Sequence, residues 1–338
     1  MSLTTHLERL MQRQHLSAEI CEQLTADFLN PDSNSLQLAA LLVLLRAKPE
    51  TAEEIISIAA VLRKRMVVVN TKHKVLDIAG TGGDGANTIN ISTGGALLAA
   101  TCGVKIAKHG NRAVSSRAGS ADVLEALGIN IQLTPEKVAQ CIDKVGIGFC
   151  YAPLFHPALQ AVRELRKQLK VATIFNLLGP LLNPTNPQHI LLGVYDAKLL
   201  PVFAQAIQQK TEKSMIVNGC QTDELTSIGP TTIYEIVNKN IVKKIFEPSK
   251  VNFSVGQLSD LKGGNAEENA AILLEIFSGN YREKYKIIAD TLVLNAATAL
   301  YLFDLAKSID EAIPQVFEKL HSGSTLKLIK SFKECSHD

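Results

Sequence analysis

The stretch 74–120 constrains the fold more than any other part of the chain. Residues 75–79 form a short apolar run, and the glycine-rich loop Gly80-Thr81-Gly82-Gly83-Asp84-Gly85 follows it directly. A helix of small residues, expected to begin near Thr93, leads to a second apolar run at 104–107. Strand, loop, helix and strand make one βαβ unit, whose loops leave the carboxyl edge of a parallel sheet, where ligands bind. The stretch therefore predicts an α/β domain with a ligand site at that edge.

Strands and helices alternate after this unit, whereas residues 1–70 contain only helical patterns. Thr51 and Glu54 predict a capping box, Ser35 is expected to cap the third helix, and 231–237 with 241–246 read as a hairpin. The expected fold class is α/β, with a small all-α lobe at 1–70 and a large α/β lobe at 71–338 around a mostly parallel sheet. Helices at about 165–185 are expected to join the small lobe.

The whole chain, at 338 residues, carries a net charge of only +2, so any anion site must be built locally. This balance gives no reason to expect nucleic acid as a partner. The longest apolar run, 38–45, is too short to cross a bilayer, which predicts no membrane partner. Six cysteines without a CxxC pair suit reduced thiols, and we expect a cytoplasmic protein.

The glycine loop fits neither common nucleotide motif. A dinucleotide fold needs an acid about twenty residues on, and the sequence offers Lys105 and Lys108 there. The Walker A pattern fails because Ala86 stands where lysine is required. What remains is a loop whose amides can point at phosphate oxygens, followed by a helix start at Asn90, Ser92 and Thr93. The alternative is a tight turn with an ordinary helix cap, and the number of glycines favours anion binding.

Two further segments carry charges suited to this chemistry. Lys108, Arg112, Ser115 and Ser116 are expected on a second loop that folds over phosphates, with a solvated basic loop as the alternative. Asp223 and Glu224 follow a strand, and magnesium would compensate their mutual repulsion. An isolated Asp-Glu pair is usually a wet surface feature, so the metal interpretation depends on the phosphate loop.

Taken in order, these motifs resemble the anthranilate phosphoribosyltransferase family, of the nucleoside-phosphorylase-like phosphoribosyltransferase class. The resemblance spans nearly the whole chain, and its motifs lie at 80–84, 90–93, 108–112, 115–116, 119–125, 156–158, 175–181, 223–224 and 263–264. Departures are few: Gln221-Thr222 stands where the family more often has Gly-Leu, Ala172 where it often has arginine, and Asn265 where it usually has aspartate.

The resemblance implies a phosphoribosyl transfer from 5-phosphoribosyl 1-pyrophosphate to the amine of anthranilate, in tryptophan biosynthesis, by a homodimer. It implies that phosphoribosyl pyrophosphate binds Gly80, Gly83, Asp84, Thr88, Asn90, Ile91, Ser92, Thr93, Lys108, His109, Gly110, Asn111, Arg112, Ala113, Val114, Ser115, Ser116 and Ser120. Magnesium, as two ions, would be held by Ser92, Asp223 and Glu224. Anthranilate would contact Gly80, Asn111 and Arg166.

The chemistry needs stabilisation of departing pyrophosphate, which we assign to Lys108, magnesium and loop amides. The sequence shows no general base, although His109 and His156 are candidates. Two alternatives stay open here. One is a nucleoside phosphorylase on the same fold, whose Lys-His-Ser-Thr-Gly-Gly signature is missing. The other is a non-catalytic nucleic-acid-binding relative, which the balanced charge disfavours.

Overall fold

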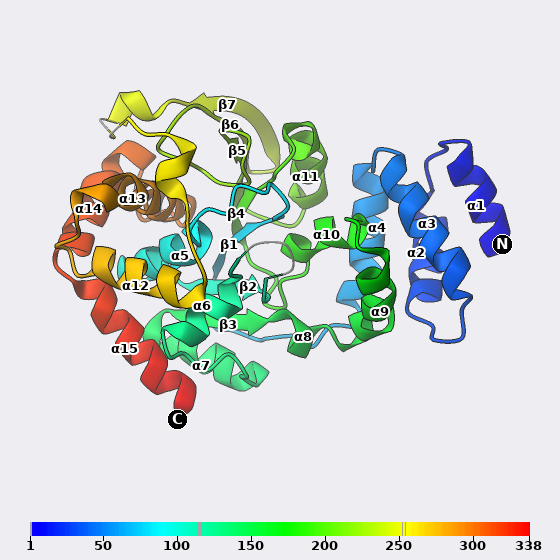
Figure 1. Ribbon diagram of the computed structural model, residues 1–338, viewed down its shortest axis with the longest axis horizontal. Helices are drawn as coiled ribbons and strands as arrows, with labels where there is room; N and C mark the ends of the chain where they lie inside the picture. Colours follow the sequence, from blue (N-terminus) through cyan, green and yellow to red (C-terminus); the bar gives the residue numbers. More distant parts are fainter. Residues whose placement is uncertain (1, 114–116, 252, 254) are drawn as a thin grey trace. The chain divides into compact units, whose positions relative to one another are not determined.

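The computed structural model describes residues 2–113, 117–251, 253 and 255–338, and the chain divides into two compact units (Figure 1). Unit 1 comprises Met1–Val68 and Pro153–Pro184, and unit 2 comprises Val69–Ala152 and Thr185–Asp338. No helix in the described ranges is long and apolar enough to cross a membrane.

Unit 1 is helical. Its helices are α1 (Leu3–Met11), α2 (Ala18–Phe28), α3 (Ser35–Ala47), α4 (Ala52–Arg63), α9 (Gln160–Leu169) and α10 (Ile174–Leu178), and the short α8 (Ala152–Phe155) leads into it. The capping box of Thr51 and Glu54 is confirmed at the start of α4. The cap predicted for α3 is wrong by one residue, because the Asn34 side chain accepts the first free amides and Ser35 is already helical.

The two chain segments of unit 1 pack together through α9 and α10, which contact α3 and α4. Phe175 on α10 meets Phe28 on α2 edge to face, with ring centroids 5.7 Å apart. Aromatic pairs of this geometry contribute about 0.5–1.5 kcal/mol beyond their buried area. The second segment therefore completes the core of unit 1.

Unit 2 is built on a seven-stranded sheet of order β3-β2-β1-β4-β5-β6-β7. Its strands are β1 (Leu76–Gly80), β2 (Ile106–Gly110), β3 (Ile147–Tyr151), β4 (His189–Gly193), β5 (Lys213–Gly219), β6 (Thr231–Val237) and β7 (Asn240–Phe246). The first five run parallel, and β6 and β7 form the predicted antiparallel hairpin. The predicted fold class, a helical part plus an α/β part with a mostly parallel sheet, is confirmed.

The direction of winding reverses between β1 and β4. The chain moves from β1 to β2 on one side and from β4 to β5 on the other. Because such crossovers are right-handed, α5 (Ile91–Thr101) and α11 (Leu200–Ile207) cover opposite faces of the sheet, as Figure 1 shows. The crevice between the ends of β1 and β4 is thus the topological switch point, where open α/β sheets bind ligands.

The remaining helices of unit 2 cover the sheet and its edges: α6 (Ser120–Ala126), α7 (Pro135–Val145), α12 (Ala266–Phe277), α13 (Lys286–Leu302), α14 (Ile309–His321) and α15 (Ser324–His337). Close approach of α13 to α5 explains the small residues of α5. A Cβ on Gly95 would lie 2.9 Å from the Asn295 Cβ, and one on Gly94 would lie 2.8 Å from the Leu292 Cδ2. These glycines fix α5, and with it the start of the helix at the switch point.

Candidate active site

The glycine loop lies at the switch point and is tied to the end of β4. Thr81 N donates to Gly193 O at 3.0 Å, and Tyr195 N donates to Thr81 Oγ1 at 3.1 Å. Gly82 and Gly83 have φ angles of +66° and +87°, which residues with a side chain rarely adopt. The glycines therefore shape a turn whose backbone is open to close approach by a ligand.

The helix after this loop begins earlier than predicted: α5 starts at Ile91, with Asn90 as its N-cap, rather than near Thr93. The Asn90 side chain makes no cap hydrogen bond. Its Nδ2 donates to Ala118 O at 3.0 Å, and its Oδ1 accepts from Asn269 Nδ2 at 2.8 Å. Ile91 N and Thr93 N already donate to Ile89 O and Asn90 O, so it is mainly the positive end of the helix dipole that suits an anion here.

The prediction that Lys108 begins an open loop is wrong. Lys108 and His109 lie within β2, and both side chains are buried. Lys108 Nζ donates to Ile78 O at 2.7 Å and lies 3.2 Å from Ser92 Oγ. Burial lowers the pKa of Lys108, while the charges of Asp77 and Glu224 raise it. The buried ammonium group is thus held by a carbonyl and a hydroxyl, and the charges of two nearby carboxylates favour its protonated form.

The loop after β2 is organised by Asp122 of α6. Asp122 Oδ2 accepts from Ala113 N at 2.9 Å and from Gly119 N at 2.8 Å. Arg112 donates to Asp122 Oδ1 at 3.1 Å and to Glu125 Oε1 at 2.9 Å, so its guanidinium points to α6. Asn111 is exposed and Ser120 Oγ donates to Asn111 O at 3.4 Å. The candidates Val114, Ser115 and Ser116 lie outside the described residues.

Asp223 and Glu224 lie on the turn after β5 and face the glycine loop. Asp223 Oδ2 accepts from Gly82 N at 2.6 Å, and Asp223 N lies 3.4 Å from Asp84 Oδ2. The approach requires glycine on both neighbouring strands, because a Cβ on Gly80 would lie 2.3 Å from Asp223 Oδ2 and one on Gly193 only 1.6 Å from Asp223 O. The structure thus brings three carboxylates, Ser92 and Lys108 to one crevice.

Crowding of these carboxylates disfavours their charged forms. Burial, then the charge of Asp84, raises the pKa of Asp223 to about 7. Burial and the charges of Asp223 and Asp84 raise the pKa of Glu224 well above its usual value, and Lys108 opposes this shift. A desolvated anionic cluster of this kind calls for a cation.

The donor set of the crevice is incomplete for a metal on its own but suits magnesium with a substrate. Within the described ranges, no three His, Cys, Asp or Glu side chains form a self-sufficient metal site. Magnesium usually takes one or two carboxylates and completes its shell with water and substrate phosphates. The two carboxylates after β5 and the Ser92 hydroxyl therefore fit a metal that arrives with a phosphorylated substrate.

Two candidates belong to unit 1. Arg166 on α9 is half-buried, its guanidinium carbon lies 5.6 Å from the centre of the Phe175 ring, and burial lowers its pKa. His156 is buried, and burial lowers its pKa to about 4. Its ring is neutral at pH 7, so it cannot serve there as an imidazolium acid.

His156 should make stability depend on pH. Since its folded pKa of about 4 lies below the ordinary value of 6.5, the unfolded chain binds more protons between these values, and stability falls as pH drops through them. Between pH 7 and pH 4 the free energy of unfolding should fall in both proteins. We expect the fall to be about 3 kcal/mol smaller in His156→Gln than in wild type. Urea unfolding at both pH values measures this, with exposed His337→Gln as the control. Equal losses in wild type and His156→Gln would contradict the assignment.

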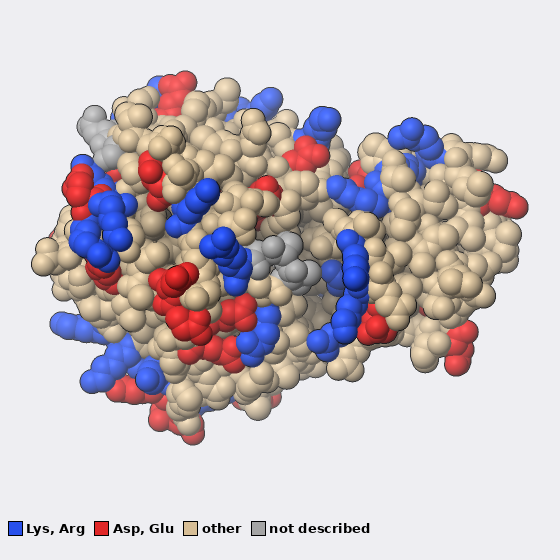
Figure 2. Space-filling view, viewed as in Figure 1, with Lys and Arg blue, Asp and Glu red and all other residues tan. Residues whose placement is uncertain are grey.

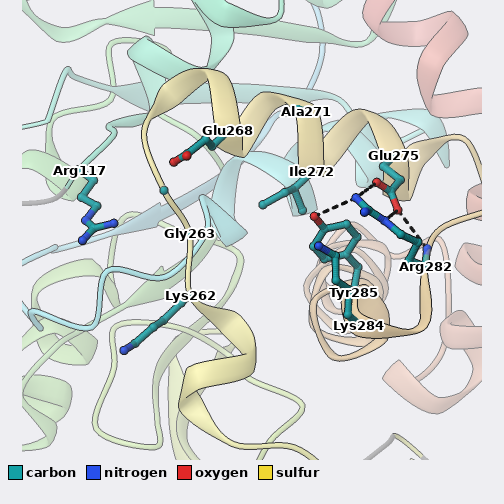
Figure 3. Close-up of a pocket in the computed structure, with 11 residues that line it drawn as sticks. Arg117, Lys262, Gly263, Glu268, Ala271, Ile272, Glu275, Arg282, Lys284 and Tyr285 are labelled. Carbon is teal, nitrogen blue, oxygen red and sulfur yellow. Dashed lines mark hydrogen bonds and ion pairs between the residues drawn. The ribbon is translucent and has the colours of Figure 1, made fainter.

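A pocket of about 500 Å³ is lined by Arg117, by residues 262–264, by α12 and by residues 282–285 (Figure 3). One wall, residues 262–264, pairs with the segment that follows the glycine loop, where Gly263 N donates to Asn87 O at 3.0 Å. Figure 3 shows Arg117 and Lys262 on two sides of Gly263, whereas Arg282 is held by Glu275 at the other end. Lys262 pairs with Thr88 across an isolated β-bridge, so its charge lies beside the segment that follows the glycine loop.

The face of unit 2 in view carries charged side chains of both signs. Figure 2 shows its Lys and Arg side chains interspersed with Asp and Glu rather than gathered in one stripe.

The sequence did not predict the residues that hold the acidic turn, the segment 220–225 that carries Asp223 and Glu224. Asn218 donates from Nδ2 to Val194 O at 2.8 Å and to Thr222 O at 3.0 Å, and Asn295 Nδ2 donates to Leu225 O at 2.8 Å. Val194 and Asn295 are distant in the chain from the turn, and no motif links them. Only the polar residue Asn218 at the end of an otherwise apolar strand could have drawn attention.

Comparison with known families assigns both parts of the chain. Residues 4–66 match the model of the glycosyl transferase family, helical bundle domain, and residues 72–326 match that of the glycosyl transferase family, a/b domain. Similar curated proteins include the anthranilate phosphoribosyltransferases of Chlamydia caviae and Bacillus cereus. The first is 40% identical over 97% of this chain and 94% of its own length, and the second 42% over 96% and 95%.

Solved structures agree with these matches. The anthranilate phosphoribosyltransferase of Thermus thermophilus is 34% identical and superposes with a TM-score of 0.91 over 98% of this chain and 99% of its own. The Saccharomyces cerevisiae enzyme in complex with PRPP and Mg is 30% identical, with a TM-score of 0.90 over 99% and 98%. The same yeast enzyme in complex with 4-fluoroanthranilate has a TM-score of 0.86 at 28% identity over 99% of each chain.

Proposed function

The chain belongs to the anthranilate phosphoribosyltransferase family, and from this we infer that the crevice between β1 and β4 is where it binds phosphoribosyl pyrophosphate. The protein transfers the phosphoribosyl group of 5-phosphoribosyl 1-pyrophosphate to the amine of anthranilate, a step of tryptophan biosynthesis. The products are N-(5-phosphoribosyl)anthranilate and pyrophosphate. The observation that carries the assignment of the site is the meeting of Lys108, Ser92 and the carboxylates after β5 beside the glycine loop.

The donor of the phosphoribosyl group is bound, in this proposal, by backbone amides more than by side chains. The left-handed glycines of the loop leave its backbone open to phosphate oxygens. The first turn of α5, at Ile91, Ser92 and Thr93, supplies the positive end of a helix dipole beside the loop. The loop Asn111–Ala113 and Ser120 complete the phosphoribosyl pyrophosphate site.

Magnesium is proposed to bind at Ser92, Asp223 and Glu224, as two ions. The nearby carboxylate of Asp84 supports more than one ion, because three carboxylates and pyrophosphate carry more negative charge than one divalent cation neutralises. When bound, magnesium neutralises negative charge on pyrophosphate. The acidic side chains would also orient the substrate phosphates by holding their counter-ions in one place.

Lys108 is proposed to stabilise the departing pyrophosphate. It is buried and already fixed by Ile78 O and Ser92 Oγ, so it needs little reorganisation when negative charge develops. The anthranilate amine is conjugated to its ring and is unprotonated at neutral pH, so attack on the ribose carbon needs alignment more than deprotonation. We therefore assign no general base, and His109 and His156 stay candidates only.

The acceptor anthranilate is proposed to contact Gly80, Asn111 and Arg166. The Arg166 guanidinium lies over the Phe175 ring and, as a planar fork of donors, suits a carboxylate. Arg166 would therefore pair with the anthranilate carboxylate, while Asn111, which is exposed, orients the aromatic acid.

Removal of the Arg166 side chain should weaken the binding of anthranilate and leave the binding of phosphoribosyl pyrophosphate nearly unchanged. Loss of a charge-assisted contact of about 1.5–3 kcal/mol raises the KM for anthranilate roughly 10–100-fold. We expect Arg166→Ala to show this rise with the KM for phosphoribosyl pyrophosphate changed less than about threefold. Steady-state kinetics with each substrate varied in turn measures both values. Arg166→Lys, which keeps charge but not the planar fork, is the matched variant, and equal rises for both substrates would contradict the carboxylate role.

A homodimer through unit 1 is proposed, and the exposed apolar side chains of α1 and α3 support it. Leu36 and Val43, two turns apart on α3, are 81% and 43% exposed, and Met11 of α1 is 70% exposed. Exposed apolar residues on one helix face mark interaction surfaces.

We also propose a cytoplasmic location, which the six free thiols support.

A charge on this surface should dissociate the dimer. We expect Leu36→Glu to be monomeric at protein concentrations at which wild type is dimeric, because a buried unpaired carboxylate costs several kcal/mol. Sedimentation velocity measures the mass of both. Ser35→Glu, which adds the same charge one position earlier on α3, should stay dimeric. A dimeric Leu36→Glu protein would place the interface elsewhere.

The reaction itself is tested with the purified chain. Anthranilate is fluorescent, and its signal should fall when phosphoribosyl pyrophosphate and magnesium are both present, but not when either is omitted or EDTA is added. If the fluorescence does not fall in the presence of folded protein, the activity is refuted.

The comparisons do not favour the two alternatives raised by the sequence, a nucleoside phosphorylase and a non-catalytic nucleic-acid-binding relative. Phosphorolysis of nucleosides and a gel shift at physiological salt should both be negative.

A further inference from the structure

Asn218 connects the turn after β5 to the end of β4. It is the last residue but one of β5 and is 9% exposed. Its single amide nitrogen lies within hydrogen-bond distance of three carbonyl oxygens, at 2.8 Å from Val194 O, 3.2 Å from Tyr195 O and 3.0 Å from Thr222 O. Val194 and Tyr195 belong to the segment after β4 that also bonds to the glycine loop. Thr222 is the residue immediately before Asp223.

The turn after β5 contains backbone conformations that its residue types disfavour. Cys220 and Gln221 have φ angles of +52° and +64°, in the left-handed region, although neither is glycine. Each such residue costs about 1–2 kcal/mol relative to right-handed backbone. Thr222 closes the turn locally, with both its N and its Oγ1 donating to Gly219 O. Bonds from outside the turn are therefore needed to hold this arrangement.

A second asparagine holds the other end of the acidic pair. Asn295 of α13 is buried, and its Nδ2 donates to Leu225 O at 2.8 Å. Asp223 and Glu224 thus lie between two backbone carbonyls, Thr222 O and Leu225 O, that are each fixed by a buried side-chain amide. Of the two, only Asn218 also reaches the end of β4, so it ties the turn that carries Asp223 and Glu224 to the strand end that holds the glycine loop.

We propose that Asn218 is a positioning residue that holds Asp223 and Glu224 where they bind magnesium with phosphoribosyl pyrophosphate. This inference rests on the proposed function. The role requires a neutral donor, because an acceptor at the same place would face three carbonyl oxygens. Leucine has a similar size but no donor, and it would leave Thr222 O and Val194 O without this bond.

The test compares Asn218→Leu with Asn218→His, which retains one ring N–H donor. For Asn218→Leu we expect the magnesium concentration for half-maximal rate to rise about tenfold, as for the loss of one to two hydrogen bonds. The KM for phosphoribosyl pyrophosphate should rise with it, while the KM for anthranilate stays within about twofold. Asn218→His should lie nearer to wild type. Asn130→Leu is the matched control, because Asn130 Nδ2 donates to Ser336 O, on α15.

A readout independent of turnover is the rise in melting temperature on titration with magnesium at fixed phosphoribosyl pyrophosphate. The half-saturating magnesium concentration should rise about tenfold in Asn218→Leu and stay unchanged in Asn130→Leu. If Asn218→Leu does not fold, Asn218→Ser, which leaves room for water, should show a rise of at least about threefold.

The outcomes separate the inference from the function. A wild type that responds to magnesium and an Asn218→Leu variant with the same half-saturation would overturn the positioning role alone. A lower melting temperature in both Leu variants, with no change in magnesium dependence, would likewise reduce Asn218 to a stabilising residue. A wild type that neither responds to magnesium nor consumes anthranilate would overturn both.

Discussion

Replacement of either carboxylate after β5 should abolish most activity and, unusually, stabilise the metal-free protein. We expect Asp223→Asn and Glu224→Gln to lower kcat/KM by roughly 10²–10³, the range for removal of one preorganised electrostatic group. Each should also raise the magnesium concentration needed for half-maximal rate. Activity falls because a ligand for the magnesium that accompanies pyrophosphate is lost. Stability rises because one of several buried like charges is removed.

The stability effect has a defined pH dependence. The folded pKa of Asp223, about 7, lies above the ordinary value of 3.8, so the folded protein binds more protons between these values. Its contribution to stability is present at low pH and is lost as pH rises through 7. At pH 8 without magnesium, Asp223→Asn should therefore melt roughly 2–4 °C above wild type, the shift produced by about 1 kcal/mol in a domain of this size.

Activity assays and calorimetry at pH 6 and pH 8 check both effects. Glu212→Gln is the control, because Glu212 forms an exposed pair with Lys74 and should change neither property. A variant that loses activity and melts lower than wild type would indicate that the carboxylate has a structural role. Unchanged magnesium dependence in both variants would remove these residues from the metal site.

Gly193→Ala should be the most damaging single-methyl substitution at the site. The added Cβ would lie 1.6 Å from Asp223 O and 2.4 Å from the Asp223 carbonyl carbon, so backbone must move. We expect a loss of about 1–3 kcal/mol in unfolding free energy, the usual cost of overpacking. We also expect a fall of about tenfold or more in kcat/KM, because displacement of the acidic turn misplaces the counter-ions.

Chemical unfolding and steady-state kinetics measure the two losses. Gly179→Ala is the matched control, since a Cβ there meets nothing within 4 Å and the backbone has no positive φ. It should be neutral or slightly stabilising. If Gly193→Ala kept full activity and stability, the close approach of the two backbones would not be required.

Periodicity and local chemistry predict the fold class from the sequence. The run at 75–79, the hairpin around Asn238 and the capping box at Thr51 depend on neighbours in sequence, and all three are confirmed. The sequence pattern places the start of α5 two residues late, because Asn90 fits a phosphate motif as well as it fits a cap. The pattern misplaces Lys108 because a lysine ends apolar periodicity, although here Asp77 and a backbone carbonyl compensate its burial.

The parts of the site that escape prediction depend on tertiary contacts. Gly193 ends a strand and has an ordinary backbone conformation, so its sequence context gives no sign that Asp223 lies against it. The amide of Asn218 reaches a segment more than twenty residues away. Such close approaches arise only when the sheet is assembled, and no local pattern encodes them.

The interrupted course of unit 1 has a consequence for synthesis on the ribosome. Its first segment ends at Val68, and the helices that complete its core belong to Pro153–Pro184. At bacterial and eukaryotic elongation rates, the ~115 residues between Val68 and Pro184 take roughly 6–23 s to translate. During that interval α1–α4 lack Phe175 and the rest of α10, so their apolar faces are open to chaperones and to neighbouring nascent chains. The amino-terminal helices therefore emerge first but complete their packing only after about half the chain has been made.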